Sequence, residues 1–138
     1  MRYFIRFSYD GTGYCGYQRQ PEQISVQEVL EEALSLMLKD SIKTTGAGRT
    51  DTGVHASEMF AHFDYDKVLP EGFIWKLNSF LPQDISIQDI FQVSDSAHAR
   101  FDAVKRTYQY FISIRKNPFK QRFHAQFLYY NFDVEKMN

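Results

Sequence analysis

The sequence has little of the residues that mark several special classes of protein. Its 138 residues include one cysteine, Cys15, which excludes an intramolecular disulfide framework and a cysteine-rich metal site. It has no apolar signal-like segment at its start and no run of about 18 apolar residues, so nothing indicates a membrane span. The simplest interpretation is a cytoplasmic protein with no membrane partner.

Neither positive nor negative charge dominates the sequence, because the net charge is −1. No global positive field therefore indicates nucleic acid as a partner. The distribution is uneven, however: the stretch from Arg100 to Arg122 holds seven basic residues against the single acid Asp102, a net charge of +6. Aromatic residues interleave with these basic residues, which suits phosphates and unstacked bases. The alternative is an ordinary solvated face.

The hydrophobic pattern predicts an α+β domain. Residues 2–9 alternate as a strand does, and Ser25 with Glu28 forms a capping box that opens a helix to about Lys39. Further elements are predicted as strands at 41–45, 58–64 and 85–91, and as a helix from Pro70 to about Phe80. This order predicts a ferredoxin-like split βαβ fold, with an antiparallel sheet and helices on one face.

Three further segments follow in the last third of the chain. Residues 104–114 are rich in β-branched and aromatic residues and predict the longest strand, and residues 127–132 predict one more. Residues 133–138 resemble a helix N-cap and first turn, so we expect the natural domain to continue beyond them.

The segment Gly11–Gly16 matches the G-x-G-x-x-G pattern of dinucleotide-binding proteins directly after a strand. In those proteins the glycine loop runs straight into a helix whose N-terminus faces the pyrophosphate. Here Pro21 and a polar loop intervene before the helix begins at Ser25. We therefore expect these glycines to serve a tight turn or a close approach of backbone.

The most unusual connector is the segment Gly46–Ala56, which reads GAGRTDTGVHA. Its three glycines frame a guanidinium, two hydroxyls and a carboxylate, so the loop can hold one acid through local hydrogen bonds. Two other interpretations remain open on spacing alone. Asp51 can cap backbone N–H groups in an Asx-turn, or Asp51, His55 and His62 can bind a metal ion.

Four motifs together resemble the TruA-type tRNA pseudouridine synthases, in the order of that family and over nearly the whole chain. They are Tyr9-Asp10-Gly11-Thr12-x-Tyr14-x-Gly16-Tyr17-Gln18-x-Gln20, Gly48-Arg49-Thr50-Asp51-x-Gly53-Val54-His55-Ala56, Leu81-Pro82-x-Asp84-Ile85, and Ala99-Arg100-Phe101-x-Ala103 with Arg106-x-Tyr108-x-Tyr110. One departure is Tyr17, where the family commonly has Trp.

The resemblance implies isomerisation of uridine to pseudouridine on the 3′ side of the tRNA anticodon stem-loop (tRNA positions 38–40). One carboxylate, implied to be Asp51, attacks the ribose or the uracil or takes the C2′ proton. The target uridine must flip out of its stack to reach a buried acid. No redox step and no net hydrolysis occur, so the resemblance implies neither a cofactor nor a metal.

The resemblance also implies roles for other residues. Tyr108 would stack on the flipped base, and Arg49 would replace the base in its stack, although an ion pair with an acid is the structural alternative for Arg49. Contact with RNA or support of the loop is implied for Gln18, Arg19, His55, Arg100, Lys105 and Arg106.

The same family has a second half of similar length and forms homodimers that grip tRNA. Residues 1–138 would then be an N-terminal domain truncated before the C-terminal domain, which would supply a basic partner for Asp51. Alone, this part is expected to be nearly inactive. Two other functions remain: a non-catalytic RNA-binding module, and a nucleotide-binding oxidoreductase based on Gly11–Gly16.

Overall fold

The computed structural model describes residues 1–137. The chain divides into two compact units, one from Met1 to Val104 and one that begins at Lys105. Within residues 1–137, no helix combines the length and the apolar composition that crossing a membrane requires.

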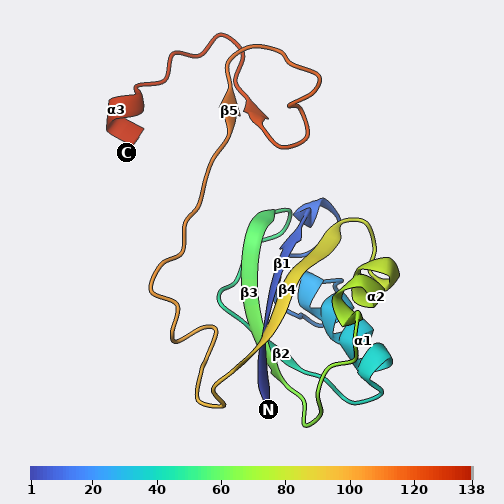
Figure 1. The fold of residues 1–138 in the computed structure, drawn as a ribbon. Helices are drawn as coiled ribbons and strands as arrows, with labels where there is room; N and C mark the ends of the chain where they lie inside the picture. The colour runs from blue at the N-terminus through green and yellow to red at the C-terminus, as the bar shows by residue number, and fades with distance from the viewer. Residues whose placement is uncertain (138) are drawn as a thin grey trace. The chain divides into compact units, whose positions relative to one another are not determined.

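The first unit is one four-stranded antiparallel sheet with two helices on one of its faces (Figure 1). Its elements are β1 (Arg2–Tyr9), α1 (Val26–Leu38), β2 (Thr44–Gly46), β3 (Ala56–Asp64), α2 (Phe73–Phe80) and β4 (Ile85–Val93). The strands lie in the order β2-β3-β1-β4, and every neighbouring pair is antiparallel. Because β3 lies between β1 and β2, the predicted ferredoxin-like split βαβ arrangement is confirmed.

Local patterns explain the first strand and the first helix. Side chains of β1 alternate between faces, and Ile5 and Phe7 are fully buried on the face that the helices cover. Helix α1 begins after Ser25, whose hydroxyl accepts a hydrogen bond of 3.2 Å from the Glu28 N–H, as the capping box predicts. It ends at Lys39, which takes the left-handed conformation (φ 53°) that closes many helices.

The core lies between the sheet and the two helices. Large side chains from both layers meet there with less than 2% of their surface exposed. Each such apolar side chain contributes about 1.5–3 kcal/mol to stability when fully buried. The most buried are Ile5, Phe7, Tyr17, Val26, Leu30, Leu34, Phe63 and Leu77.

Two elements of the first unit differ from prediction. Helix α2 begins at Phe73 and not at Pro70, because Gly72 precedes it with a left-handed φ of 66°, which no α-helix can include. Strand β2 covers 44–46 and not 41–45. Before it, the Ser35 hydroxyl bonds both the N–H and the carbonyl of Ile42, at 2.9 and 3.3 Å, and takes those groups out of strand pairing.

The second unit contains much less regular structure than the sequence predicts. It has two short parallel strands, β5 (Ile112–Ser113) and β6 (Ala125–Gln126), and a short helix α3 (Val134–Met137). The strands predicted over 104–114 and 127–132 are wrong except at 112–113. Strand propensity measures how well a side chain fits a half-buried pleated surface. Val104 and Tyr110 have 101% and 87% of their surface exposed and meet no such surface.

Candidate functional site

The glycine-rich loop between β2 and β3 is anchored at Thr50. The Thr50 hydroxyl lies 2.8 Å from the phenol oxygen of Tyr9 and accepts a hydrogen bond of 3.1 Å from the Tyr17 N–H. The same N–H faces the Thr50 carbonyl at 3.4 Å. Thr50, immediately before Asp51, is therefore held both by β1 and by the loop that follows β1.

Asp51 itself is exposed at the turn of this loop. Its carbonyl accepts a hydrogen bond of 3.1 Å from the Val54 N–H, and the Gly53 N–H donates to the Tyr14 carbonyl at 3.2 Å. Within residues 1–137, the Asp51 carboxylate makes no hydrogen bond or ion pair with protein. The turn is closed by backbone and not by the Asx-turn that spacing alone left open. The expectation of a buried acid is also wrong for the described residues, because the elements around Asp51 hold its backbone without covering its side chain.

Glycines let two backbone segments come together here. Gly16 has a φ of +79°, and a Cβ atom on it would overlap the Thr50 carbonyl. A Cβ atom on Gly11 would overlap the Val54 carbonyl in the same way. Gly11–Gly13 form a single 3-10 turn, which leads into no helix that faces a pyrophosphate. The glycines of the G-x-G-x-x-G match therefore allow close packing against the Asp51 loop.

His55 supports the far end of the loop. Its Nδ1 lies 3.0 Å from the Gly11 N–H and also 3.0 Å from an Asp10 carboxylate oxygen. One tautomer accepts from Gly11, and a ring protonated at Nδ1 donates to Asp10. Either state ties His55 to the end of β1. Within residues 1–137, no three His, Cys, Asp or Glu side chains gather as a metal site requires, so Asp51, His55 and His62 form no such group.

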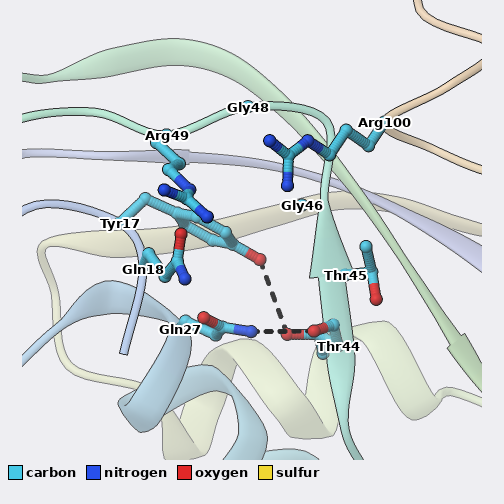
Figure 2. Close-up of a pocket in the computed structure, with 9 residues that line it drawn as sticks. All are labelled: Tyr17, Gln18, Gln27, Thr44, Thr45, Gly46, Gly48, Arg49 and Arg100. Atoms are coloured by element: carbon cyan, nitrogen blue, oxygen red, sulfur yellow. Dashed lines mark hydrogen bonds between the residues drawn. The ribbon is translucent and has the colours of Figure 1, made fainter. Parts of the chain in front are cut away.

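A polar pocket of about 190 Å³ lies against the Gly46–Arg49 side of the loop. Arg49 and Arg100 both line it, and Figure 2 shows the Arg49 side chain next to Tyr17 and Gln18, with Arg100 entering from the opposite side of the view. The remaining lining residues are Gln27, Thr44, Thr45, Gly46 and Gly48. Two cations with polar neighbours suit a phosphate or the edge of a base. Asp51 is not part of this lining.

A buried carboxylate shapes the pocket wall. Glu31 is 3% exposed and accepts hydrogen bonds from the Thr44 N–H at 2.8 Å and from Gln27 Nε2 at 3.2 Å. Arg19 and Lys43 lie 3.5 and 3.3 Å from it. Gln27 Nε2 in turn donates to the Thr44 carbonyl at 2.7 Å (Figure 2). A buried charge needs such partners, and they make Arg19 a support for the pocket wall.

The third sequence motif meets the first beside this loop. The Tyr14 phenol donates a hydrogen bond of 2.6 Å to the Asp84 carboxylate, and the Asp10 N–H donates to the Asp84 carbonyl at 2.9 Å. Burial and this hydrogen bond raise the pKa of Tyr14 well above its ordinary range. Tyr14 therefore acts as a neutral donor that joins the two segments.

The structure brings most of the predicted site residues of the first unit together. Gln18, Arg49 and Arg100 line the pocket, and Asp51 lies in the loop beside it. Arg19 contacts Glu31, and His55 contacts Gly11 and Asp10. Lys105, Arg106 and Tyr108 belong to the second unit, where Tyr108 is 59% exposed. Their roles remain predictions.

Sequence reasoning missed Thr50, Gln27 and Glu31. Thr50 was hidden because its partners lie about 33 to 41 positions away, and no periodic pattern reports such contacts. Glu31 carried a readable signal. It lies between Leu30 and Leu34 on the buried face of α1, where an acid needs an explanation.

The chain is similar to known proteins over most of its length. The profile of the tRNA pseudouridine synthase family matches residues 5–102. The chain is 50% identical over 139 residues to a tRNA pseudouridine synthase A of Bacteroides thetaiotaomicron, covering 100% of this chain and 51% of that protein. It is 49% identical over 145 residues to a tRNA pseudouridine synthase A of Bacteroides fragilis, covering 100% of this chain and 55% of that protein. It is 44% identical over 140 residues to a tRNA pseudouridine synthase A of Porphyromonas gingivalis, covering 99% of this chain and 55% of that protein.

The fold and the site define an α+β domain that carries an acid on a glycine-framed loop beside two arginines. The chain belongs to the tRNA pseudouridine synthase family, because the family profile covers most of it. It spans about half the length of the curated relatives it matches.

Proposed function

We propose that the complete protein converts uridine to pseudouridine in the anticodon stem-loop of tRNA, with Asp51 as the catalytic carboxylate. One observation supports this most. The Thr50 anchor presents an exposed carboxylate two residues from Arg49, which lines a cationic pocket together with Arg100. A flipped uridine needs an accessible acid and a cationic environment for its phosphates.

The chemistry requires only the groups of the protein. The N1–C1′ bond breaks and a C5–C1′ bond forms, while C5 loses a proton and N1 gains one. The reaction therefore has no net oxidation and no net hydrolysis, and we propose that it uses neither a cofactor nor a metal. The Asp51 carboxylate attacks the ribose or the uracil, or takes the C2′ proton.

Other residues would bind the substrate. From the pocket, Arg49 and Arg100 would contact RNA phosphates or the base stack that the flipped uridine has left. Gln18 would be a polar neighbour. In the second unit, Tyr108 would stack on the flipped base. Lys105 and Arg106 would contact the RNA backbone beside it.

Replacing the acid tests the proposal. The complete protein with Asp51→Asn is assayed for release of tritium from C5 of labelled uridine in tRNA, and tRNA affinity is measured separately. We expect turnover to fall at least about a hundredfold while affinity changes little. Asp66→Asn is the matched control, because its carboxylate is 100% exposed on the same unit. Unchanged turnover in Asp51→Asn would refute Asp51 as the catalytic group.

The same experiment tests the first alternative function. A non-catalytic RNA-binding module would bind tRNA and release no tritium in either form. The oxidoreductase alternative rests on Gly11–Gly16, whose backbone is already packed against the Asp51 loop.

We also propose that residues 1–138 alone are nearly inactive and that the complete protein acts in the cytoplasm as a homodimer. Relatives about twice as long support the first point. The turnover of residues 1–138 is compared with that of the complete protein, and similar rates would contradict the proposal. Light scattering of the complete protein measures its oligomeric state, and a monomer at assay concentration would contradict the dimer.

A further inference from the structure

The turn that follows β4 carries Arg100 to the pocket. The His98 N–H donates to an Asp102 carboxylate oxygen at 2.7 Å, and the Asp102 N–H donates back to the His98 carbonyl at 2.9 Å. Arg2 holds the start of the turn through a bond of 2.9 Å from Nη1 to the Ala97 carbonyl. The turn is therefore closed on itself and fastened to β1.

Two histidines accept the remaining backbone donors of this turn. His98 Nδ1 accepts from the Arg100 N–H at 3.2 Å and from the Phe101 N–H at 3.3 Å. His62 Nδ1 accepts from the Ala99 N–H at 3.1 Å. Three consecutive N–H groups, with Arg100 in the middle, thus end on imidazole nitrogens.

This arrangement shows which nitrogen of each ring accepts. A nitrogen that accepts an N–H hydrogen bond carries no proton, so in the neutral ring the proton lies on Nε2. The rings meet edge to face with centroids 4.6 Å apart, and the His98 ring stacks on Phe101 at 4.1 Å. A proton added at Nδ1 of either ring would face a backbone N–H, and that hydrogen bond would be lost.

The surroundings also oppose a charge on His62. It is 6% exposed, on the sheet face away from the helices. Burial is the main cause that lowers its pKa, followed by Arg2 from β1 and by His98, while Asp64 on β3 and Asp102 in the turn oppose this effect. Phe4 covers the ring from β1 with centroids 6.1 Å apart.

We propose that His62 and His98 are positioning residues for RNA binding: as hydrogen-bond acceptors they hold the 97–102 turn so that Arg100 reaches an RNA phosphate. The inference rests on the proposed function, because it requires an RNA substrate at this pocket. Neither histidine touches the substrate, and both act through Arg100.

A double-mutant cycle in the complete protein tests the link. Arg100→Ala and His98→Ala should each weaken tRNA binding and reduce the salt slope of log affinity by about 1, the effect of losing one phosphate contact. The double variant should bind no more weakly than Arg100→Ala alone. Additive losses of affinity would overturn the proposal, because they would show that His98 acts independently of Arg100.

Conservative variants distinguish positioning from general stability. In Asn, Oδ1 takes the place of Nδ1 as an acceptor and does not titrate, so His98→Asn and His62→Asn should bind tRNA near wild-type levels at about pH 7.5. His62→Ala and His98→Ala leave no acceptor in this place and should bind tRNA more weakly than the matching Asn variants. His124→Ala, in the second unit, is the control and should keep wild-type affinity. Equal affinities of the Ala and Asn variants at both positions would overturn the proposal.

Nuclear magnetic resonance of the imidazole nitrogens provides a measurement that needs no RNA. At neutral pH both rings should show the Nε2-protonated tautomer, and a proton on Nδ1 of either ring would overturn the proposal. Wild-type protein that binds no tRNA at any pH would instead refute the proposed function. The two failures can therefore be told apart.

Discussion

The hydroxyl groups of Tyr9 and Thr50 lie 2.8 Å apart, although 41 positions separate the two residues. Tyr9 ends β1 and Thr50 precedes Asp51, so this contact fastens the loop of the acid to the centre of the sheet. The strand order makes it possible, because β1 lies beside β3, into which the loop leads. A rigid element thus positions a group that the loop alone would leave mobile.

The first prediction concerns the Thr50 anchor. Thr50→Val keeps the shape of the side chain but removes the hydroxyl that Tyr9 and the Tyr17 N–H use. We expect turnover to fall roughly tenfold to a hundredfold because the acid is misplaced, with a loss of about 1 kcal/mol in the free energy of unfolding. Thr50→Ser keeps the hydroxyl and should retain most activity. Equal activity in both variants would contradict the anchor.

The second prediction concerns the close approach at Gly16. Gly16→Ala adds a Cβ atom against the Thr50 carbonyl at a φ of +79°. We expect the free energy of unfolding to fall by about 1–3 kcal/mol, as measured by denaturant titration. Gly13→Ala is the matched control, since nothing lies within 4 Å of a Cβ atom there. Similar losses in both variants would show that the contact does not matter.

The third prediction concerns the buried carboxylate of Glu31. Glu31→Gln places an amide group where Arg19, Lys43 and the Thr44 N–H all require an acceptor. We expect a loss of about 1–3 kcal/mol in the free energy of unfolding, below the values for fully buried pairs because both cations are exposed to solvent. The neighbouring exposed Glu32→Gln should change stability by less than about 0.5 kcal/mol. A stable Glu31→Gln variant would contradict the role of this network.

The fourth prediction concerns alkaline pH. Burial is the main cause that raises the pKa of Tyr17 above its ordinary value of 10.0, and its hydrogen bond to Thr44 opposes this only in part. The folded state therefore favours the neutral phenol. This contribution is fully present below about pH 10 and is lost as pH rises further, because the unfolded chain then releases its proton first.

Denaturant titrations from neutral pH to above pH 10 measure this contribution. The free energy of unfolding should fall less steeply on the alkaline side in Tyr17→Phe than in the wild type, even if the variant is less stable throughout. Tyr129→Phe is the control, because its side chain is 100% exposed, and it should follow the wild type. Parallel curves for Tyr17→Phe and wild type would contradict the prediction.

Much of the first unit could be predicted because its signals are local. Alternation along 2–9 and the capping box at Ser25 depend on residues within one element, and both match the structure. Strand prediction failed at 104–114, where composition was right but a neighbouring strand was lacking over most of the segment. Strands form only with partners, and partners are not a local property.

The sequence by itself determined the element order, the residues of the Asp51 loop and the family motifs, because spacing and residue type carry that information directly. Only the tertiary structure decided that the Asp51 carboxylate is exposed, that Thr50 is its anchor, and that His62 accepts from the Arg100 turn. These contacts join segments brought together by the strand order β2-β3-β1-β4. Their geometry depends on which strands are neighbours, and no periodicity within a single segment encodes that choice.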